Sequence, residues 1–99
     1  MVTISVYQLI GKSAISMSSG DKVYQLIYQN LKTQEDIVLD FNGVVYFASP
    51  FFNASIGRLL KDLSIDDLLQ KVQMKHLDPV GKNLLNLSIA NALKIFKRD

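Results

Sequence analysis

The chain contains no cysteine, and this absence removes several classes of chemistry. Disulfide bridges, zinc–thiolate centres and thiol nucleophiles are all excluded, and the lack of cysteine is typical of a cytoplasmic protein. His76 is the single histidine. Because a lone imidazole without carboxylates at ligand spacing does not make a metal site, we expect no metal and no cofactor.

Long apolar segments are missing as well. No apolar run approaches the ~20 residues that a helix needs to cross a bilayer. The first residues, Met1–Ser5, lack the basic segment and continuous apolar stretch of a signal peptide. We therefore expect neither a membrane span nor a leader.

Over most of the chain, charges of one sign are not clustered. The formal net charge is +2, and the nine lysines are scattered, so that only Lys94, Lys97 and Arg98 form a cluster. Such a cluster is typical of a helix C-terminus, whereas a nucleic-acid surface shows basic and aromatic or amide side chains interleaved. We expect no nucleic-acid partner.

The overall composition is that of a folded globular domain. The chain has 99 residues, of which 48% are hydrophobic and 20% are charged. This length accommodates one hydrophobic core, so residues 1–99 are predicted to form a single domain. No Ser/His/Asp arrangement, dinucleotide fingerprint or P-loop is present, and the sequence therefore predicts a protein that is not an enzyme.

Hydrophobic periodicity predicts a β-hairpin followed by a helix in the first third of the chain. Residues 2–10 mix β-branched and aromatic residues, Gly11-Lys12 is a plausible two-residue turn, and residues 13–17 are a possible short returning strand. Ser18-Ser19 then offers an N-cap, and apolar residues at helical spacing predict a helix over 21–32. The continuous apolar run 37–41 predicts an interior strand that is covered on both faces.

The second half predicts helices that alternate with one more strand. Ser49-Pro50 is typical of a helix start, and an apolar stripe extends that helix to about Asp62. Ser64 with Asp67 has the spacing of a capping box and indicates a short turn through residue 70. The alternating segment 71–77 predicts a strand with one solvated face, or an edge strand protected by lysines. Asp78-Pro79 begins a last helix with a wide apolar face.

The predicted order is therefore β-β-α-β-α-β-α. It defines a small α/β domain in which helices pack on a mixed sheet of about four strands. At the end of the interior strand, Asp40 is expected to accept hydrogen bonds from loop amides and to fix the turn toward Gly43.

The segment from Leu39-Asp-Phe-Asn-Gly-Val44 through Phe47-Ala-Ser-Pro-Phe-Phe52 to Ile56-Gly-Arg-Leu-Leu60 resembles the STAS superfamily. It is most similar to the small STAS-like domains of unknown function. More distantly, it resembles the bacterial anti-sigma-factor antagonists, which bind an ATPase-type kinase. The resemblance implies a STAS-like fold and a bacterial or mobile-element signalling domain that binds another protein through this helix start.

The phosphorylation motif of the antagonists is altered in this chain. Those proteins carry Asp-Ser/Thr-Ser-Gly at the helix start, where a partner kinase phosphorylates the second hydroxyl. Residues 48–51 read Ala-Ser-Pro-Phe, so only Ser49 retains a hydroxyl, one position early. Ser49 is thus either a shifted phosphoacceptor or an N-cap, and the two roles are compatible because phosphate at a helix N-terminus is electrostatically favourable.

The expected partner-binding surface surrounds this helix start. Phe51 falls off the apolar stripe of its helix, so it is a candidate exposed aromatic anchor, with burial in the core as the alternative. Exposed amides near the loop are candidates for polar contacts with the partner. The predicted partner-binding residues are Asn42, Ser49, Pro50, Phe51 and Asn53.

Two other functions stay open at this point. Backbone amides at the start of the helix beginning at Pro50 could bind a small anionic ligand or a nucleotide. The wide apolar face of the last helix could instead support a homodimer or a larger homo-oligomer used as a structural module. The leading hypothesis is a non-enzymatic regulatory domain that binds a partner protein.

Overall fold

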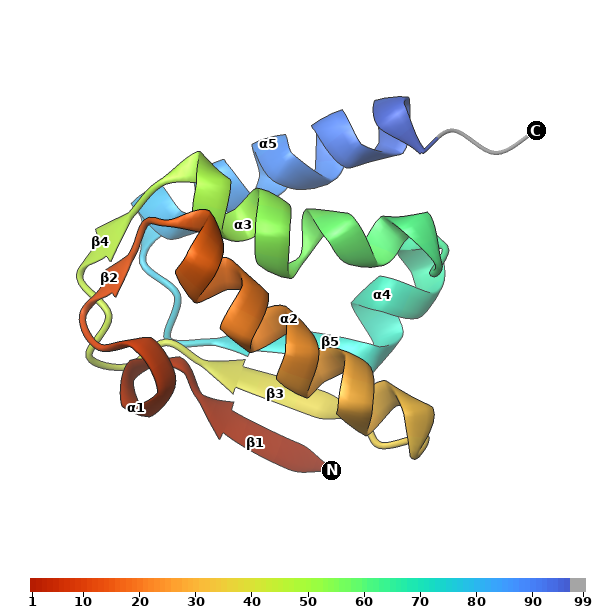
Figure 1. Cartoon of the computed structure of the whole chain (residues 1–99), viewed down its shortest axis with the longest axis horizontal. Coiled ribbons are helices and arrows are strands. Elements are labelled where there is room, and N and C mark those ends of the chain that lie inside the picture. The colour runs from red at the N-terminus through yellow and green to blue at the C-terminus, as the bar shows by residue number, and fades with distance from the viewer. Residues whose placement is uncertain (97–99) are drawn as a thin grey trace.

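The computed structural model describes residues 1–96 (Figure 1). Its elements, in chain order, are β1 (Val2–Ser5), α1 (Val6–Ile10), β2 (Ser13–Ala14), α2 (Met17–Lys32), β3 (Ile37–Asp40), β4 (Tyr46–Phe47), α3 (Ser49–Ser55), the 3₁₀ helix η1 (Gly57–Lys61), α4 (Ile65–Lys71), β5 (Val72–Lys75) and α5 (Pro79–Ile95). The α/β class that the sequence predicts is confirmed.

The strands form two parallel sheets rather than one mixed sheet. The larger sheet has the order β1-β3-β5, and β2 pairs with β4 in a separate two-stranded sheet. Since β1 and β2 do not pair, the predicted hairpin is wrong. Its first arm bends after Ser5, whose Oγ accepts a hydrogen bond from the backbone N–H of Gln8 at 3.2 Å and so caps α1.

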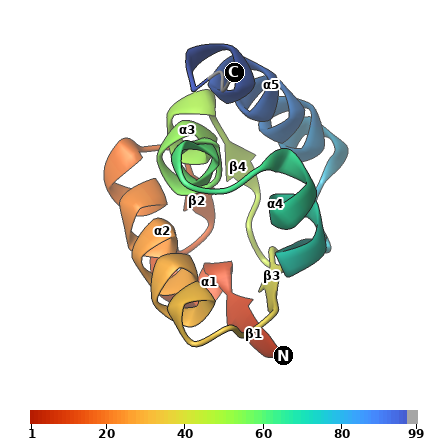
Figure 2. The same cartoon turned by 90° about the vertical axis from the view of Figure 1, so that its right-hand side faces the viewer.

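Helices cover only one face of the three-stranded sheet. Figures 1 and 2 show α2 and α4 beside that face, with α3 above them and α5 farthest from the sheet. On β3, Ile37 and Leu39 are buried, whereas Val38 and Asp40 are half-buried on the opposite side. The prediction that this strand is covered on both faces is therefore wrong, although parallel sheets are usually covered on both.

Helix α2 begins four residues earlier than the sequence indicates. Its N-cap is Ser16, whose Oγ accepts from the backbone N–H of Ser19 at 3.0 Å, so neither Ser18 nor Ser19 is the cap. The extension brings Gly20 against α3. A Cβ at Gly20 would lie 2.4 Å from the carbonyl oxygen of Phe51, and only glycine permits this approach of the two helices.

The predicted helix over 50–62 is divided into two parts. Helix α3 ends at Ser55, and the chain continues as the tighter η1 from Gly57. Glycine has a low helix propensity, and short 3₁₀ segments are common where an α-helix ends.

The sequence predicts the start of both later helices correctly. Ser64 caps α4 by accepting from the N–H of Asp67 at 3.2 Å, and Asp78 caps α5 by accepting from the N–H of Val80 at 2.7 Å. Between them, β5 is an edge strand, as predicted. Helix α5 packs on α3 and η1, which forms the surface described next.

Candidate functional site

Asp40 organises the loop that follows the central strand. Its Oδ1 accepts a hydrogen bond from the backbone N–H of Asn42 at 3.0 Å, which confirms the predicted role in the turn. Gly43, two residues beyond Phe41, has a φ of 96° and provides the left-handed conformation that the turn requires. The Asn42 hydrogen bond, followed by the one from His76, lowers the pKa of the Asp40 carboxyl below its ordinary value.

His76 is the partner of Asp40 that the sequence did not reveal. Its Nδ1 lies 3.0 Å from Asp40 Oδ1, although the two residues are 36 positions apart. Asp40 is the last residue of β3 and His76 follows the last residue of β5, and the carboxyl ends of these neighbouring parallel strands meet at one edge of the sheet. That adjacency was the available signal, and recognising it required knowing that β5 pairs with β3.

The Asp40–His76 pair does not extend into a larger catalytic or metal-binding arrangement. Within residues 1–96, no group of three or more His, Cys, Asp or Glu side chains is placed to hold a metal ion. No hydroxyl in this part of the chain is hydrogen-bonded to His76. His76 has a φ of 57°, a conformation that histidine adopts more readily than most residues, and the Asp40 contact holds its ring.

Ser49 is not the N-cap of its helix. The cap position is Ala48, with extended backbone angles of −149° and 156°, and no side chain caps the helix. Ala48 is extended because its N–H donates to the carbonyl of Ala14 at 3.0 Å, which prolongs the pairing of β4 with β2. The Ser49 hydroxyl is half-buried and has no hydrogen-bond partner in the described part of the chain.

Phe51 is in the core, and the expectation that it is an exposed anchor is wrong. Its exposed fraction is 0%, and its ring meets that of Phe52 edge-on at a centroid distance of 5.2 Å. It also contacts Phe41 edge-on at 6.5 Å. The predicted stripe missed Phe51 because α3 packs on two helices, α2 and α5, so its buried arc is wider than one stripe.

The other predicted residues fall into two places. Asn42 lies in the loop after β3, whereas Ser49, Pro50 and Asn53 lie on α3, beyond β4. Asn42, Pro50 and Asn53 are exposed. Asn53 has a structural role as well, because its Oδ1 accepts a hydrogen bond from Ser88 Oγ on α5 at 2.7 Å.

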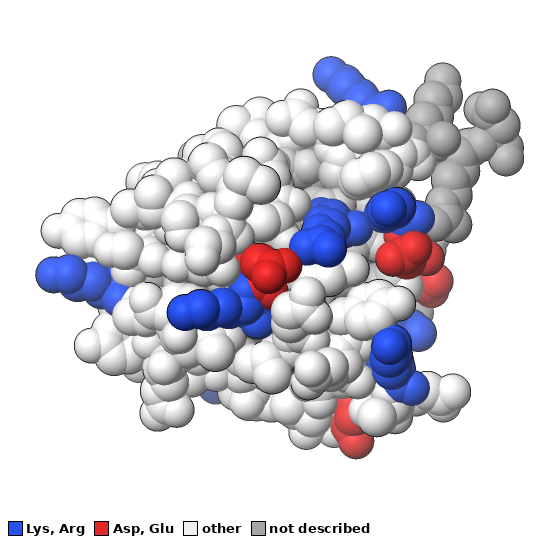
Figure 3. Space-filling model, in the orientation of Figure 1, with Lys and Arg blue, Asp and Glu red and all other residues white. Residues whose placement is uncertain are grey.

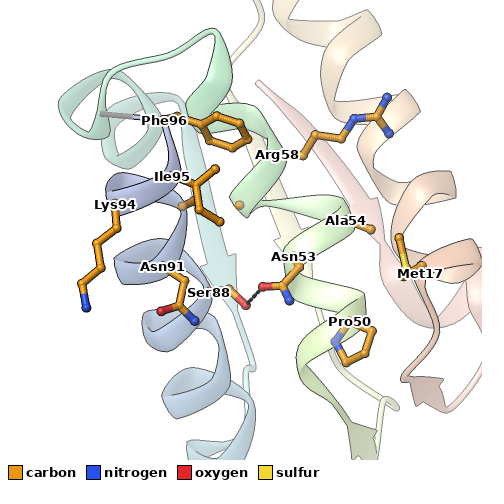
Figure 4. A pocket seen from close by; sticks show the side chains of 12 residues that line it. Met17, Pro50, Asn53, Ala54, Arg58, Ser88, Asn91, Lys94, Ile95 and Phe96 are labelled. Atoms are coloured by element: carbon orange, nitrogen blue, oxygen red, sulfur yellow. Dashed lines mark hydrogen bonds between the residues drawn. The ribbon is translucent and has the colours of Figure 1, made fainter. Parts of the chain in front are cut away.

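A groove of about 790 Å³ runs between α3 and α5 beside this hydrogen bond (Figure 4). We call it the α3–α5 groove. Most of its lining is apolar, and the described residues that line it include two cations and no carboxylate. The lining residues are Met17, Pro50, Asn53, Ala54, Gly57, Arg58, Ser88, Asn91, Ala92, Lys94, Ile95 and Phe96. Sequence reasoning found Pro50 and Asn53 but missed the α5 side, because pairing α5 with α3 is a tertiary feature.

Charged side chains are unevenly distributed around the molecule. In the view of Figure 3 they gather in the middle and on the right, with one more cation at the left edge, whereas the upper left is uncharged. That area overlies β4 and the adjoining parts of α3 and α5 in Figure 1. Exposed apolar residues from these segments include Tyr46 and Val80. An uncharged surface with exposed apolar side chains is typical of a protein-binding site.

The fold is thus an α/β domain of parallel strands, in which the chain after β3 leads through a loop and β4 to the start of α3. The model of one family, described as a STAS-like domain of unknown function (DUF4325), matches residues 19–82. The chain belongs to this family, as the sequence resemblance suggested. No curated protein and no solved structure matches it.

None of the helices within residues 1–96 combines the length and the apolar character needed to cross a bilayer.

Proposed function

We propose that the chain is a non-enzymatic regulatory domain that binds a partner protein across the start of α3 and the α3–α5 groove. The groove is the observation that carries this proposal, since it joins Pro50 and Asn53 to a larger apolar surface. Met17 and Ile95 line it with exposed fractions of 68% and 73%. Large apolar side chains left exposed beside a groove favour burial against another protein.

The resemblance to anti-sigma-factor antagonists suggests an ATPase-type kinase as the partner. Ser49 is the remaining hydroxyl of the altered motif, and it has no described hydrogen bond that a phosphate would have to break. The proposed phosphoacceptor is therefore Ser49. Intact-mass measurement of the chain after incubation in its native lysate, with and without ATP, tests this role against a Ser49→Ala variant.

A photo-crosslinking experiment tests the proposed surface. Benzoylphenylalanine is introduced at Asn91, which lines the groove, or at Asn83, an exposed asparagine of the same helix that does not. We expect a covalent adduct with one protein partner from position 91 and none from position 83. Equal adducts from both positions, or none from position 91, would contradict the proposal.

Homo-oligomerisation is a second candidate because α5 leaves several apolar side chains exposed. Val80, Leu87 and Leu93 are 59%, 58% and 42% exposed, in addition to Ile95. Light scattering on the full chain at high concentration tests this function. A monomer under those conditions rules it out.

The anionic-ligand alternative has less support from the site. Helix α3 has only seven residues, and Pro50 in its first turn lacks an N–H donor. Thermal shift measurements with nucleotides and phosphorylated metabolites at millimolar concentration test it, and an unchanged melting temperature would exclude it.

A further inference from the structure

The α3–α5 groove has the geometry of an incomplete helix bundle. The α3 side contributes Pro50, Asn53, Ala54 and Gly57, a spacing of i, i+3, i+4 and i+7 that continues into η1. The α5 side contributes Ser88, Asn91, Ala92 and Ile95 with the same spacing. Each element therefore presents one face along about two turns to the same groove.

Small residues form the floor of the groove. The floor lies between the axes of α3 and α5 and consists of Ala54, Gly57, Ser88 and Ala92. The hydrogen bond from Ser88 Oγ to Asn53 Oδ1, 2.7 Å long, joins the two helices there. A Cβ placed on Gly57 would lie 3.6 Å from the Ala92 Cβ, so the two backbones are already close. A third helix can approach such a floor at the usual interaxial distance of about 8–10 Å.

The walls carry larger side chains, and there is one cation on each rim. Met17 and Ile95 stand beside the floor with exposed apolar side chains. Figure 4 shows Arg58 on the α2 side of the groove and Lys94 on the α5 side. Arg58 pairs with Asp21 at 2.9 Å, whereas Lys94 has no ion-pair partner among the described residues.

We propose that the α3–α5 groove binds an amphipathic helix of the partner protein, with apolar residues at i, i+3, i+4 and i+7 and carboxylates flanking them. This inference rests on the proposed function and specifies the partner's chemistry. The apolar face of that helix would lie on the small floor between Met17 and Ile95. Its carboxylates would face Lys94, because Lys94 has no ion-pair partner among the described residues, whereas Arg58 is already paired with Asp21.

Defined peptides test the proposal directly. Two stapled 16-residue helices carry the same leucine stripe, with glutamate at the flanking positions of one and lysine at those of the other. Each is titrated into the isotope-labelled full chain and followed by amide chemical shifts. We expect the acidic helix to bind at least ten times more tightly, with the largest shifts at Gly57, Ser88 and Ala92.

Matched variants distinguish specific binding in the groove from non-specific hydrophobic binding of the peptide. Ile95→Ser should weaken the acidic helix at least tenfold, whereas Leu93→Ser, an exposed leucine on α5 outside the groove, should not. Lys94→Glu should remove the preference for the acidic helix, whereas Lys82→Glu, on the same helix outside the lining, should retain it. Circular dichroism melting of each variant confirms that it is folded.

Three results would overturn the proposal. They are equal binding of both peptides, shifts centred outside the groove, and no binding of the acidic helix. If partner crosslinking at position 91 persists in that last case, partner docking stands and only the acidic-helix chemistry is wrong. If crosslinking is also lost, the proposed function fails with it.

Discussion

Helix α3 has two contrasting sides. Toward α2 it is closed, because the missing side chain of Gly20 lets the two helices meet at the Phe51 carbonyl. Toward α5 it is open, since the Asn53–Ser88 hydrogen bond holds the helices together but a groove of about 790 Å³ separates their outer faces.

Because of this contrast, residues that are neighbours in sequence have different roles, some in the stability of the fold and others in the groove. Phe51 and Phe52 stabilise the fold, whereas Pro50 and Asn53, on either side of them, line the groove. Substitutions on the closed side should therefore change the free energy of unfolding. Substitutions on the open side should change binding and leave stability nearly unchanged.

The largest effect is expected from Phe51→Ala. Removing a fully buried ring leaves a cavity among Phe41 and Phe52, so unfolding should become easier by about 3–5 kcal/mol. Urea denaturation measures this change. Tyr46→Ala is the control, because Tyr46 is 53% exposed and its loss should cost no more than about 0.5 kcal/mol. A Phe51→Ala variant as stable as that control would place Phe51 outside the core.

Gly20→Ala should have the next largest effect on the free energy of unfolding. Helix propensity alone would make this change favourable by roughly 0.5–1 kcal/mol. The added methyl, however, would lie 2.4 Å from the Phe51 carbonyl oxygen and 2.9 Å from the Ala54 Cβ, so we expect a net loss of about 1–3 kcal/mol.

Gly57→Ala is the matched control on the open side. Its nearest neighbour, the Ser88 carbonyl oxygen, would be 3.5 Å away, so stability should change by no more than about 0.5 kcal/mol. If the two glycine variants were equally stable, the closed and open sides of α3 would not differ in packing as described.

Sequence reasoning was most reliable where one local interaction decides the structure. The caps at Ser64 and Asp78 and the turn at Asp40 each depend on residues two or three positions apart, and each was predicted correctly. The hairpin was wrong because β1 pairs with β3 and β2 with β4. Apolar periodicity does not distinguish the short helix α1 from a strand of the same length.

The candidate site was predicted in part for the same reason. Pro50 and Asn53 lie beside a local helix start signal. Ser88, Asn91 and Ile95 join them only through the packing of α5 on α3, and His76 reaches Asp40 only through the β3–β5 pairing. These long-range contacts leave no local pattern, so one sequence does not reveal them.

A pH titration probes the Asp40 loop, which lies outside both sides of α3. The pKa of Asp40 is lower in the folded chain than in the unfolded one, so its contribution to stability is complete above its unfolded pKa. That contribution is lost as pH falls through the folded pKa. Urea denaturation between about pH 5 and pH 2 should show a steeper loss for the wild type than for Asp40→Asn. Equal slopes would show that the Asn42 and His76 contacts do not favour the carboxylate.

The smallest effect is expected from Ser55→Ala on the closed side. Ser55 is fully buried, and its Oγ has no hydrogen-bond partner. Removing a buried unsatisfied hydroxyl, which leaves the Cβ as a methyl group, should leave stability unchanged or raise it by up to about 1 kcal/mol. A clear loss of stability in thermal unfolding would indicate that the hydroxyl is bonded after all.

Lysine footprinting of the partner complex tests the central claim, that the partner binds the open side of α3. Lys94 flanks the α3–α5 groove, whereas Lys75 is on β5, and both are exposed. Amine acetylation followed by peptide mass spectrometry is compared for the free chain and the complex. The account predicts that Lys94 becomes protected while Lys75 keeps its reactivity. Protection of Lys75 with Lys94 unchanged would contradict it and place the partner on the sheet.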